Sequence, residues 1–177
     1  DVTFAWTADT VGQGWGINPD WGGMRGFEAM RQESPDFFVF SGDTVYADGP
    51  IQREVTLADG KTWKNVTIPE KAKVAETLDE FRAAHKYNFM DEHVRAFNAE
   101  VPIFVQWDDH EVTNNWSPSK QLGDAYQEKQ IALLTARAAK AFHEYMPIAT
   151  TLAEPQRVHD GHVSDDDRSA QSPLAPR

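Results

Sequence analysis

Apolar residues along the chain follow two patterns, short continuous runs and helical stripes. Three runs have the length of buried strands and are expected to form strands at 2–7, 37–41 and 103–107. Between the first two runs, Met24, Phe27 and Met30 recur every third residue, so 24–33 is expected to form a short helix with one apolar face. A strand, a helix and a strand at this spacing predict a βαβ unit with parallel strands and a right-handed crossover.

The middle of the chain predicts a hairpin and more helices. Residues 53–68 alternate around the sequence ADGK, in which Asp-Gly is typical of a tight hairpin turn. The segment 69–87 opens with Pro-Glu and places Val74, Leu78 and Phe81 on one stripe, which predicts an amphipathic helix. Two further helices are expected at 90–100 and 122–146.

The alternation of strands and helices places the chain in the α/β class. We expect one domain over 1–153. The last stretch, 154–177, has almost no bulky apolar residue and is rich in Asp, Ser and Pro. Such a segment cannot bury enough apolar surface to offset the entropy of ordering it, so it is expected to be disordered.

Composition and charge exclude several classes of partner. The 177 residues carry a formal net charge of −11, which argues against non-specific binding to nucleic acid and against an anionic membrane surface. A phosphorylated substrate would also be repelled unless a bound metal reversed the sign locally. There is no cysteine, so disulfides and thiolate metal sites do not occur. No apolar run has membrane-spanning length. The chain starts at Asp1 without Met, and it contains no recognisable signal peptide. We interpret this start as that of a mature or truncated chain, which allows an export signal to have been removed.

Each predicted strand of the sheet ends at an acidic residue. Asp9, Asp43 and the pair Asp108–Asp109 follow the three apolar runs. Ligands of open α/β sheets gather beyond the carboxyl ends of parallel strands, so neighbouring strands would bring these side chains to one rim. Crowded carboxylates repel unless one takes up a proton or a cation binds between them. Oxygen ligands favour hard cations such as Ca²⁺, Mg²⁺, Mn²⁺ or Fe³⁺ over zinc.

Each acidic motif alone has a structural explanation. Asp43 can be a turn residue after a strand, and DDHE at 108–111 can begin a helix. Their occurrence together, at corresponding strand ends, favours a metal site. His110 beside such a site can protonate a leaving oxygen or stabilise its charge, although a structural imidazole is the alternative. Amide oxygens of Asn114 and Asn115 suit hard cations, or simply cap a loop. The remaining helical histidines are expected at surface or packing positions: His85, His93 and His143.

Three other motifs are weaker. HDGHVSDDD at 159–167 resembles a metal binder but lies in the segment expected to be disordered. NVT at 65–67 matches a glycosylation acceptor, which has no meaning without a secretory eukaryotic source. GQGWG at 12–16 lacks the spacing and the lysine of a phosphate-binding loop, so its glycines are interpreted as tight turns near Asp9.

Two motifs in combination resemble a known family. SGDTVYADGP supplies the pattern GD-x-x-Y, WDDHEVTNNW supplies WDDHEV-x-NN, and FAWTADTVGQGWGIN lies at the expected place before them. Over residues 1 to about 157 the chain resembles the alkaline phosphatase D-like (PhoD-like) phosphatases of the calcineurin-like metallophosphoesterase superfamily. The resemblance implies a layered β-sandwich flanked by helices, hydrolysis of phosphate mono- and diesters at alkaline pH, bound Ca²⁺ and Fe³⁺, and an exported protein.

The resemblance also implies roles for individual residues. Asp43 matches a carboxylate that bridges two metals, and Asp109 and His110 match a motif that binds metal or phosphate and acts in catalysis. The other implied metal ligands are Asp9, Tyr46, Tyr87 and Asn114. Tyr46 matches a position that either ligates or packs, and Tyr87 matches a tyrosinate ligand.

The chain departs from the family pattern at two places. Asp9 stands where some relatives have a cysteine that binds iron, so an iron–thiolate bond is impossible here. Relatives also complete the site with an Asp and a His from the second half of the sandwich, so this chain is expected to supply only the N-terminal half of the catalytic domain. The principal hypothesis is a metal-dependent phosphoesterase. The alternatives are a truncated, non-catalytic remnant and a metal- or phosphate-binding module.

Overall fold

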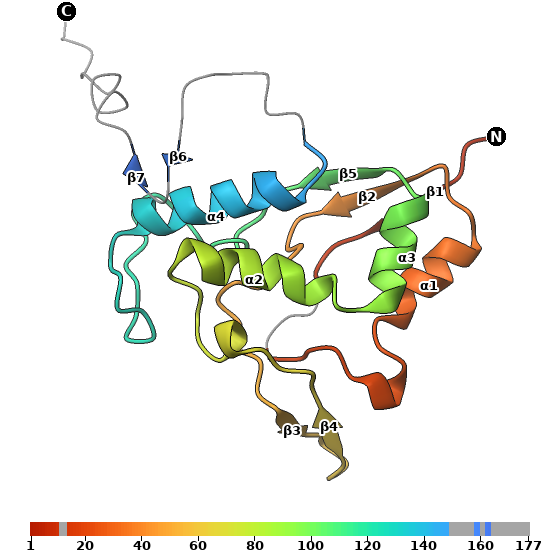
Figure 1. Cartoon of the computed structure of the whole chain (residues 1–177), viewed down its shortest axis with the longest axis horizontal. Coiled ribbons are helices and arrows are strands. Elements are labelled where there is room, and N and C mark those ends of the chain that lie inside the picture. The colour runs from red at the N-terminus through yellow and green to blue at the C-terminus, as the bar shows by residue number, and fades with distance from the viewer. Residues whose placement is uncertain (11–13, 149–157, 160–161, 164–177) are drawn as a thin grey trace, which may run out of the picture.

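The centre of the molecule is a parallel sheet with the strand order β1-β2-β5 (Figure 1). Its strands are β1 (Phe4–Thr7), β2 (Phe37–Ser41) and β5 (Ile103–Gln106). The computed structural model describes residues 1–10, 14–148, 158–159 and 162–163. Helix α1 (Arg25–Gln32) connects β1 to β2, which confirms the predicted βαβ unit. The α/β class is therefore confirmed, and the carboxyl ends of all three strands lie at one edge of the sheet.

Helices cover one face of the sheet. Phe38 and Phe40 of β2 pack against Phe27 of α1 and against Val94 and Phe97 of α3 (Glu92–Glu100). Phe38 and Phe97 are fully buried, with ring centroids 5.1 Å apart at nearly a right angle. Met24 and Met30 pack at the margin of the same cluster, as the spacing of three predicted. Burial of these side chains holds α1 and α3 against the sheet. It therefore stabilises the strands, whose carboxyl ends share one edge.

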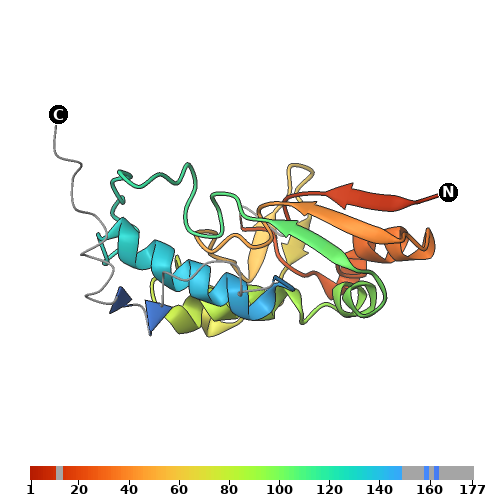
Figure 2. The same cartoon turned by 90° about the horizontal axis from the view of Figure 1, so that it is seen from above.

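The opposite face of the same sheet is apolar and uncovered. Phe4, Trp6 and Phe104 expose 57%, 69% and 63% of their surface, and Phe37 and Val39 lie between them in register. Figure 2 shows α1 and α3 on one side of the sheet only. Parallel sheets are ordinarily buried on both faces. The second sheet of the expected sandwich is not among the described residues, so the sandwich remains a prediction.

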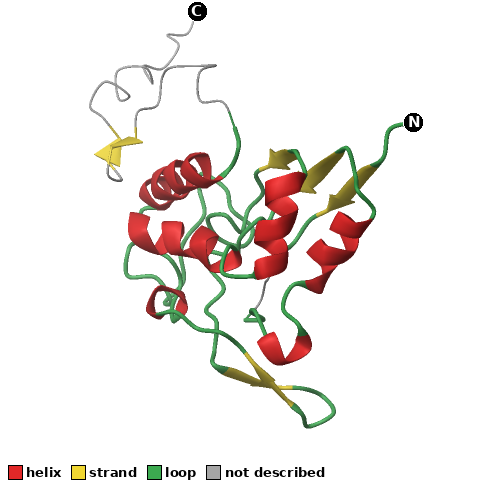
Figure 3. Cartoon of the chain, turned by 45° about the vertical axis from the view of Figure 1, so that its right-hand side comes forward, coloured by secondary structure: helices red, strands yellow, loops and turns green. Residues whose placement is uncertain are grey.

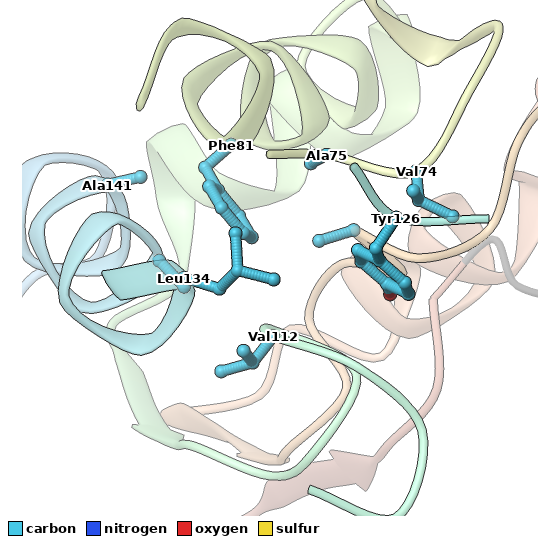
Figure 4. Packing of buried hydrophobic residues seen from close by; sticks show 9 residues of the cluster. Val74, Ala75, Phe81, Val112, Tyr126, Leu134 and Ala141 are labelled. Atoms are coloured by element: carbon cyan, nitrogen blue, oxygen red, sulfur yellow. The ribbon is translucent and has the colours of Figure 1, made fainter. Parts of the chain in front are cut away.

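A second core cluster lies between α2 (Leu78–Asn88) and α4 (Ile131–Tyr145). Figure 4 shows Phe81 and Leu134 pointing toward each other from these helices, with Val112 from the loop after β5 beneath them. All three are at most 1% exposed. This cluster anchors the loop that follows β5, which carries the acidic motif 108–111.

Two predicted helices begin later than expected. The segment expected at 69–87 forms a 3-10 turn, η2 (Pro69–Lys71), followed by residues without regular secondary structure, and α2 begins only after Thr77. Thr77 and Glu80 form a reciprocal capping box that stops the helix from extending backward. The helix expected at 122–146 begins at Ile131, because the Glu76 carboxylate accepts hydrogen bonds from the backbone N–H groups of Gln127 and Glu128.

The remaining elements are small. The predicted hairpin is formed by β3 (Glu54–Thr56) and β4 (Thr62–Lys64), and Gly60 at its turn has φ 81°. A 3-10 turn, η1 (Pro19–Trp21), precedes α1, and a pair of two-residue strands follows α4, as Figure 3 shows: β6 (Val158–His159) and β7 (His162–Val163). Most of 154–177 lies outside the described residues. In the described part, no helix is long and apolar enough to cross a membrane.

The buried His85 should make the fold sensitive to acid. Burial lowers the pKa of His85 to about 4, so the folded chain binds no proton there at a pH at which the unfolded chain does. Stability from this residue is complete above the unfolded pKa of about 6.5 and falls as pH drops toward 4. Lowering the pH from about 7 to about 5 is expected to cost about 2 kcal/mol through His85.

Urea unfolding of the wild-type chain and of His85→Phe at the two pH values measures this loss. The variant should lose about 2 kcal/mol less than the wild type over the same interval. His143→Phe is the matched control, because His143 is exposed on α4. An equal loss in wild type and His85→Phe would contradict the prediction.

Candidate metal centre

The ends of β1 and β2 are tied together by backbone hydrogen bonds. The N–H of Asp9 donates to Gly42 O (3.3 Å) and the N–H of Thr10 donates to Asp43 O (3.0 Å). Asp9 and Asp43 both have left-handed backbone, with φ of 57° and 49°. Non-glycine residues rarely adopt this conformation, and at such positions Asp is enriched. Both chains thus turn sharply where the strands stop, and both turns present a carboxylate.

Gly42 allows β2 and β5 to approach at the same edge. Its φ is 88°, and a Cβ atom built on it would lie 2.5 Å from Cβ of Asp108. Only glycine fits both the conformation and the space. The Gly-Asp pair of the first motif therefore packs directly against the acidic motif that follows β5.

Asp43, Asp109 and His110 meet at this edge. One potential ligand atom from each of the three lies within 4.8 Å of the others. The backbone N–H of His110 donates to Asp43 Oδ1 at 3.2 Å. Burial raises the pKa of Asp43 to about 6, and the nearby Glu111 and Asp108 carboxylates act in the same direction. A buried carboxylate among other acidic groups is relieved by a proton or by a cation. DDHE forms a single turn here, so it does not begin a helix.

Tyr46 connects Asp9 to this group. Its hydroxyl donates to Asp9 Oδ1 at 2.5 Å, and its ring stacks on the His110 imidazole with centroids 4.2 Å apart. Burial raises the pKa of Tyr46, and the neighbouring Asp9 and Asp43 raise it further. The three strand ends therefore deliver Asp9, Asp43 and Asp109 to one rim, as the sequence predicted, and Tyr46 lies between them.

Asp48 positions the imidazole of His110 and was missing from the predicted site. Its Oδ1 lies 2.7 Å from His110 Nδ1, and its Oδ2 accepts from the N–H of Asn114 at 2.7 Å. Tyr46 and Gly49 complete a hollow of about 300 Å³ around these three residues. Asp48 occurs in the same motif as Asp43, five residues later, but nothing in its sequence context distinguishes it from an ordinary turn residue. The hollow brings Asn114 beside His110.

Removal of the Asp48 charge should lower the pKa of His110. Burial alone would lower this pKa, but the hydrogen bond and charge of Asp48, with the charges of Asp43 and Asp109, outweigh it and raise the pKa. Asp48→Asn is expected to reduce the pKa of His110 in the metal-free chain, because it removes the nearest negative charge. An NMR titration of the His110 ring proton measures the change, with Asp59→Asn at the hairpin turn as control. An unchanged pKa in Asp48→Asn would refute the assigned role.

Two buried ionisable residues, Glu111 and Lys71, form hydrogen bonds with the loops of the site. The carboxylate of Glu111 accepts from the N–H and hydroxyl of Thr44 (2.6 and 2.7 Å) and from the N–H of Asp108 (2.8 Å). Glu111 is 1% exposed, and burial raises its pKa. Lys71, 4% exposed, donates to Tyr46 O at 2.6 Å, and burial lowers its pKa to about 8. Neither residue was a predicted site residue. Glu111 joins the two acidic loops through direct hydrogen bonds.

Other predicted candidates lie elsewhere. The Tyr87 hydroxyl accepts from the N–H of Ile17 (2.9 Å) and donates to Val66 O (2.7 Å), and Tyr87 belongs to a separate buried cluster with Ile17 and Ile51. The structure therefore does not bring Tyr87 into the acidic group. Asn115 is exposed, and its backbone N–H donates to the Asp109 carboxylate, so the structure links this residue to the acidic motif through its main chain.

Comparison with known proteins identifies the family of the chain. A model of the family described as PhoD-like phosphatase matches residues 4–162. The chain belongs to the PhoD-like phosphatase family. Alkaline phosphatase D of Bacillus subtilis (strain 168) is 31% identical to this PhoD-like chain over 122 residues, which are 69% of the chain and 20% of that protein. The family assignment made from the two acidic motifs is confirmed.

A solved structure titled "Structure of PhoD" shares the fold. It superposes with a TM-score of 0.60 at 24% identity, over 92% of this PhoD-like chain and 28% of the solved chain. The chain thus spans about a fifth of the length of the curated relative and little more than a quarter of the solved one. The mixed α/β fold of this chain, with its small parallel sheet, is consistent with that structure.

Proposed function

We propose that the chain supplies one wall of a metal-dependent phosphoesterase site that hydrolyses phosphate mono- and diesters. The observation that carries the proposal is the meeting of Asp43, Asp109 and His110 within 4.8 Å at the carboxyl ends of β2 and β5. Family membership supports the reaction class, because the curated relative is named an alkaline phosphatase. The net charge of −11 also requires a local positive centre if a phosphate is to approach.

The residues present fit hard cations. Asp43 is the central ligand, with Asp109 on one side and the linked pair Asp9 and Tyr46 on the other. Asn114 adds an amide beside His110. Carboxylate, phenol and amide oxygens suit Ca²⁺, Mn²⁺ or Fe³⁺, in keeping with the Ca²⁺ and Fe³⁺ that we propose. When bound, such ions bind phosphate oxygens and lower the pKa of a coordinated water.

His110 is the proposed acid. Asp48 holds its Nδ1 and leaves Nε2 at 4.0 Å from Asp109 Oδ1, at the acidic rim. The raised pKa favours an imidazolium that can donate a proton to the leaving alkoxide oxygen. Stacking on Tyr46 restricts the ring to one plane, so the proton is held in a fixed direction.

The uncovered face of the sheet supports an incomplete catalytic domain. Phe4, Trp6 and Phe104 form an apolar surface that a second protein layer ordinarily covers. The relatives are several times longer than this chain. We therefore propose that 1–153 is the N-terminal part of a layered catalytic domain, completed by further ligands from a second layer. Export from the cell is proposed on family grounds alone.

Metal binding and turnover test the proposal separately. The 177-residue chain is titrated calorimetrically with Ca²⁺ and Mn²⁺ and assayed with bis(4-nitrophenyl) phosphate. It is compared with a fusion that continues into the part of Bacillus subtilis alkaline phosphatase D that follows the matched region. Metal binding by both, with hydrolysis by the fusion only, supports an incomplete domain, and hydrolysis by the short chain supports a sufficient site. Absence of metal binding in both proteins would overturn the proposal.

The second candidate is a remnant that binds phosphate or metal without hydrolysis. The departure at Asp9 favours it, because Asp9 stands where some relatives have a cysteine that binds iron. In that case the short chain binds metal but hydrolyses nothing under any metal load, and the fusion is equally inactive.

A further inference from the structure

A buried amine lies against the turn that carries Asp48. Lys71 belongs to η2 and is 4% exposed, although lysine is almost never fully buried unless it is paired. Its Nζ donates a hydrogen bond to the backbone carbonyl oxygen of Tyr46 at 2.6 Å, so the acceptor is a neutral main-chain atom of the site. An apolar side chain of similar volume would avoid the cost of burying an amine. The burial of Lys71 therefore points to a role for its donor.

The carbonyl that accepts from Lys71 begins a tight turn. The N–H of Gly49 donates to the same oxygen at 3.1 Å, which closes a turn of the main chain over 46–49. Tyr46 O thus accepts one hydrogen bond from within the turn and one from η2. Lys71 adds a side-chain donor from another element to the main-chain hydrogen bond that closes the 46–49 turn.

The 46–49 turn sets the position of Asp48 relative to His110. Asp48 Oδ1 lies 2.7 Å from His110 Nδ1, and the side chains are only 12% and 15% exposed. The N–H of Ala47, within the turn, donates to His110 O at 2.9 Å. A carboxylate only accepts, so the Nδ1 atom must carry the proton in this hydrogen bond. The conformation of the turn therefore determines whether the carboxylate can hold that proton.

The amine and the carboxylate also interact through their charges. Burial lowers the pKa of Lys71, and the negative charge of Asp48 opposes that change. The two groups are therefore close enough for an attraction that reinforces the hydrogen bond to Tyr46 O. An amine donates to a carbonyl in its charged and in its neutral form. The hydrogen bond that holds the turn hence does not depend on the titration of Lys71.

We propose that Lys71 is a positioning residue that holds the 46–49 turn so that Asp48 faces the imidazole of His110. The proposal rests on the proposed function, in which His110 is the acid. When the imidazolium gives its Nε2 proton to the leaving oxygen, a neutral ring with its proton on Nδ1 remains. Asp48 stabilises that form, because it accepts the Nδ1 proton. Lys71 thereby determines which ring nitrogen gives up its proton.

Nitrogen NMR of the metal-free full chain, with labelled histidine, tests the proposal. At a pH well above the pKa of the imidazole, the spectra show which nitrogen of the His110 ring carries the proton. The wild-type ring should carry it on Nδ1. Lys71→Met removes the donor and should lower the ratio of the Nδ1–H to the Nε2–H form by at least about twofold, as for residues coupled in one network. Lys73→Met is the matched control, because Lys73 is exposed and pairs with Glu76 and Glu80, and it should leave the ratio unchanged.

Further variants separate positioning from a purely structural role. Asp48→Ala should lower the ratio more than Lys71→Met does, and Lys71→Met should cause no further change in the Asp48→Ala background. A purely structural role would lower stability in urea without changing the ratio in folded molecules. If Lys71→Met does not fold, Lys71→Gln replaces it, because its amide keeps a polar group in the buried position but ends short of Tyr46 O. It should change the ratio in the same direction.

Two results would overturn the proposal. One is a wild-type His110 ring with its proton on Nε2, and the other is an unchanged ratio in the folded Lys71 variant. The measurement uses neither metal nor substrate. Failure of metal binding or of hydrolysis would therefore reject the proposed function without altering this readout, and the two failures remain distinguishable.

Discussion

Asp43→Asn is expected to abolish the proposed metal-dependent hydrolysis while leaving the chain folded. The amide keeps the size of the side chain and an oxygen that accepts the N–H of His110, now at 3.2 Å. It removes the charge of the central carboxylate in the only group of three ligand atoms found among the described residues. We expect the affinity for Mn²⁺ or Ca²⁺ to fall by at least about a hundredfold and phosphodiester turnover by about a thousandfold.

The same substitution should raise the stability of the metal-free chain. The pKa of Asp43 is raised to about 6, so the folded chain is favoured when this group is protonated. The stability that Asp43 contributes is complete below the unfolded pKa of about 3.8 and is lost as pH rises toward 6. Asp43→Asn removes that loss and should stabilise the metal-free chain by about 1 kcal/mol near pH 8.

Calorimetric metal titration, phosphodiester assay and urea unfolding measure the three effects. Asp59→Asn is the matched control, since it makes the same chemical change in the exposed hairpin turn, where Asn-Gly is also favourable. Unchanged metal affinity in Asp43→Asn would reject Asp43 as a ligand. Reduced affinity accompanied by a large loss of stability would instead indicate that Asp43 is needed for folding.

Glu111→Ala is expected to destabilise the chain more than any other single change at the site. The carboxylate accepts three hydrogen bonds from donors on the two acidic loops, and it is 1% exposed. Its removal leaves the N–H and hydroxyl of Thr44 and the N–H of Asp108 without their acceptor, and it creates a cavity. The free energy of unfolding should fall by about 3–5 kcal/mol.

Urea unfolding of two Glu111 variants compares the effect of removing the side chain with the effect of removing only its charge. Glu111→Gln retains one acceptor oxygen and the volume of the side chain, so it should lose less than half as much stability as Glu111→Ala. Glu70→Ala, on the exposed surface of η2, should change stability by no more than about 0.5 kcal/mol. A Glu111→Ala variant as stable as Glu70→Ala would show that the two loops hold together without this carboxylate.

Much of the sheet and its rim follows from the sequence because local signals and topology agree there. Continuous apolar runs predicted β1, β2 and β5, and the βαβ spacing predicted the parallel pairing of the first two strands. Parallel strands end at the same edge, so Asp9, Asp43 and Asp109 had to come together once the pairing was right. The family resemblance rested on the same residues and was confirmed by the family match.

The predictions from the sequence differ from the structure where contacts between residues far apart in the chain determine the local conformation. The start of α4 is delayed because Glu76, about fifty residues earlier, binds the backbone N–H groups that the helix would otherwise use. The importance of Asp48 depends on its distance to His110, 62 residues away, which no periodicity reveals. Tyr87 is the converse case, since it fits a ligand position by resemblance, whereas its hydroxyl forms hydrogen bonds with two backbone groups in another cluster.

The apolar sheet face has a colloidal consequence. Copies of the chain carry 11 net negative charges, and their mutual repulsion acts over the Debye length, which is about 10 Å at 0.1 M salt and about 30 Å at 0.01 M. Salt shortens this range but does not weaken attraction between faces that expose Phe4, Trp6 and Phe104. Molecules of the chain are therefore expected to stay separate in low-salt buffer and to self-associate through these aromatic faces at high salt.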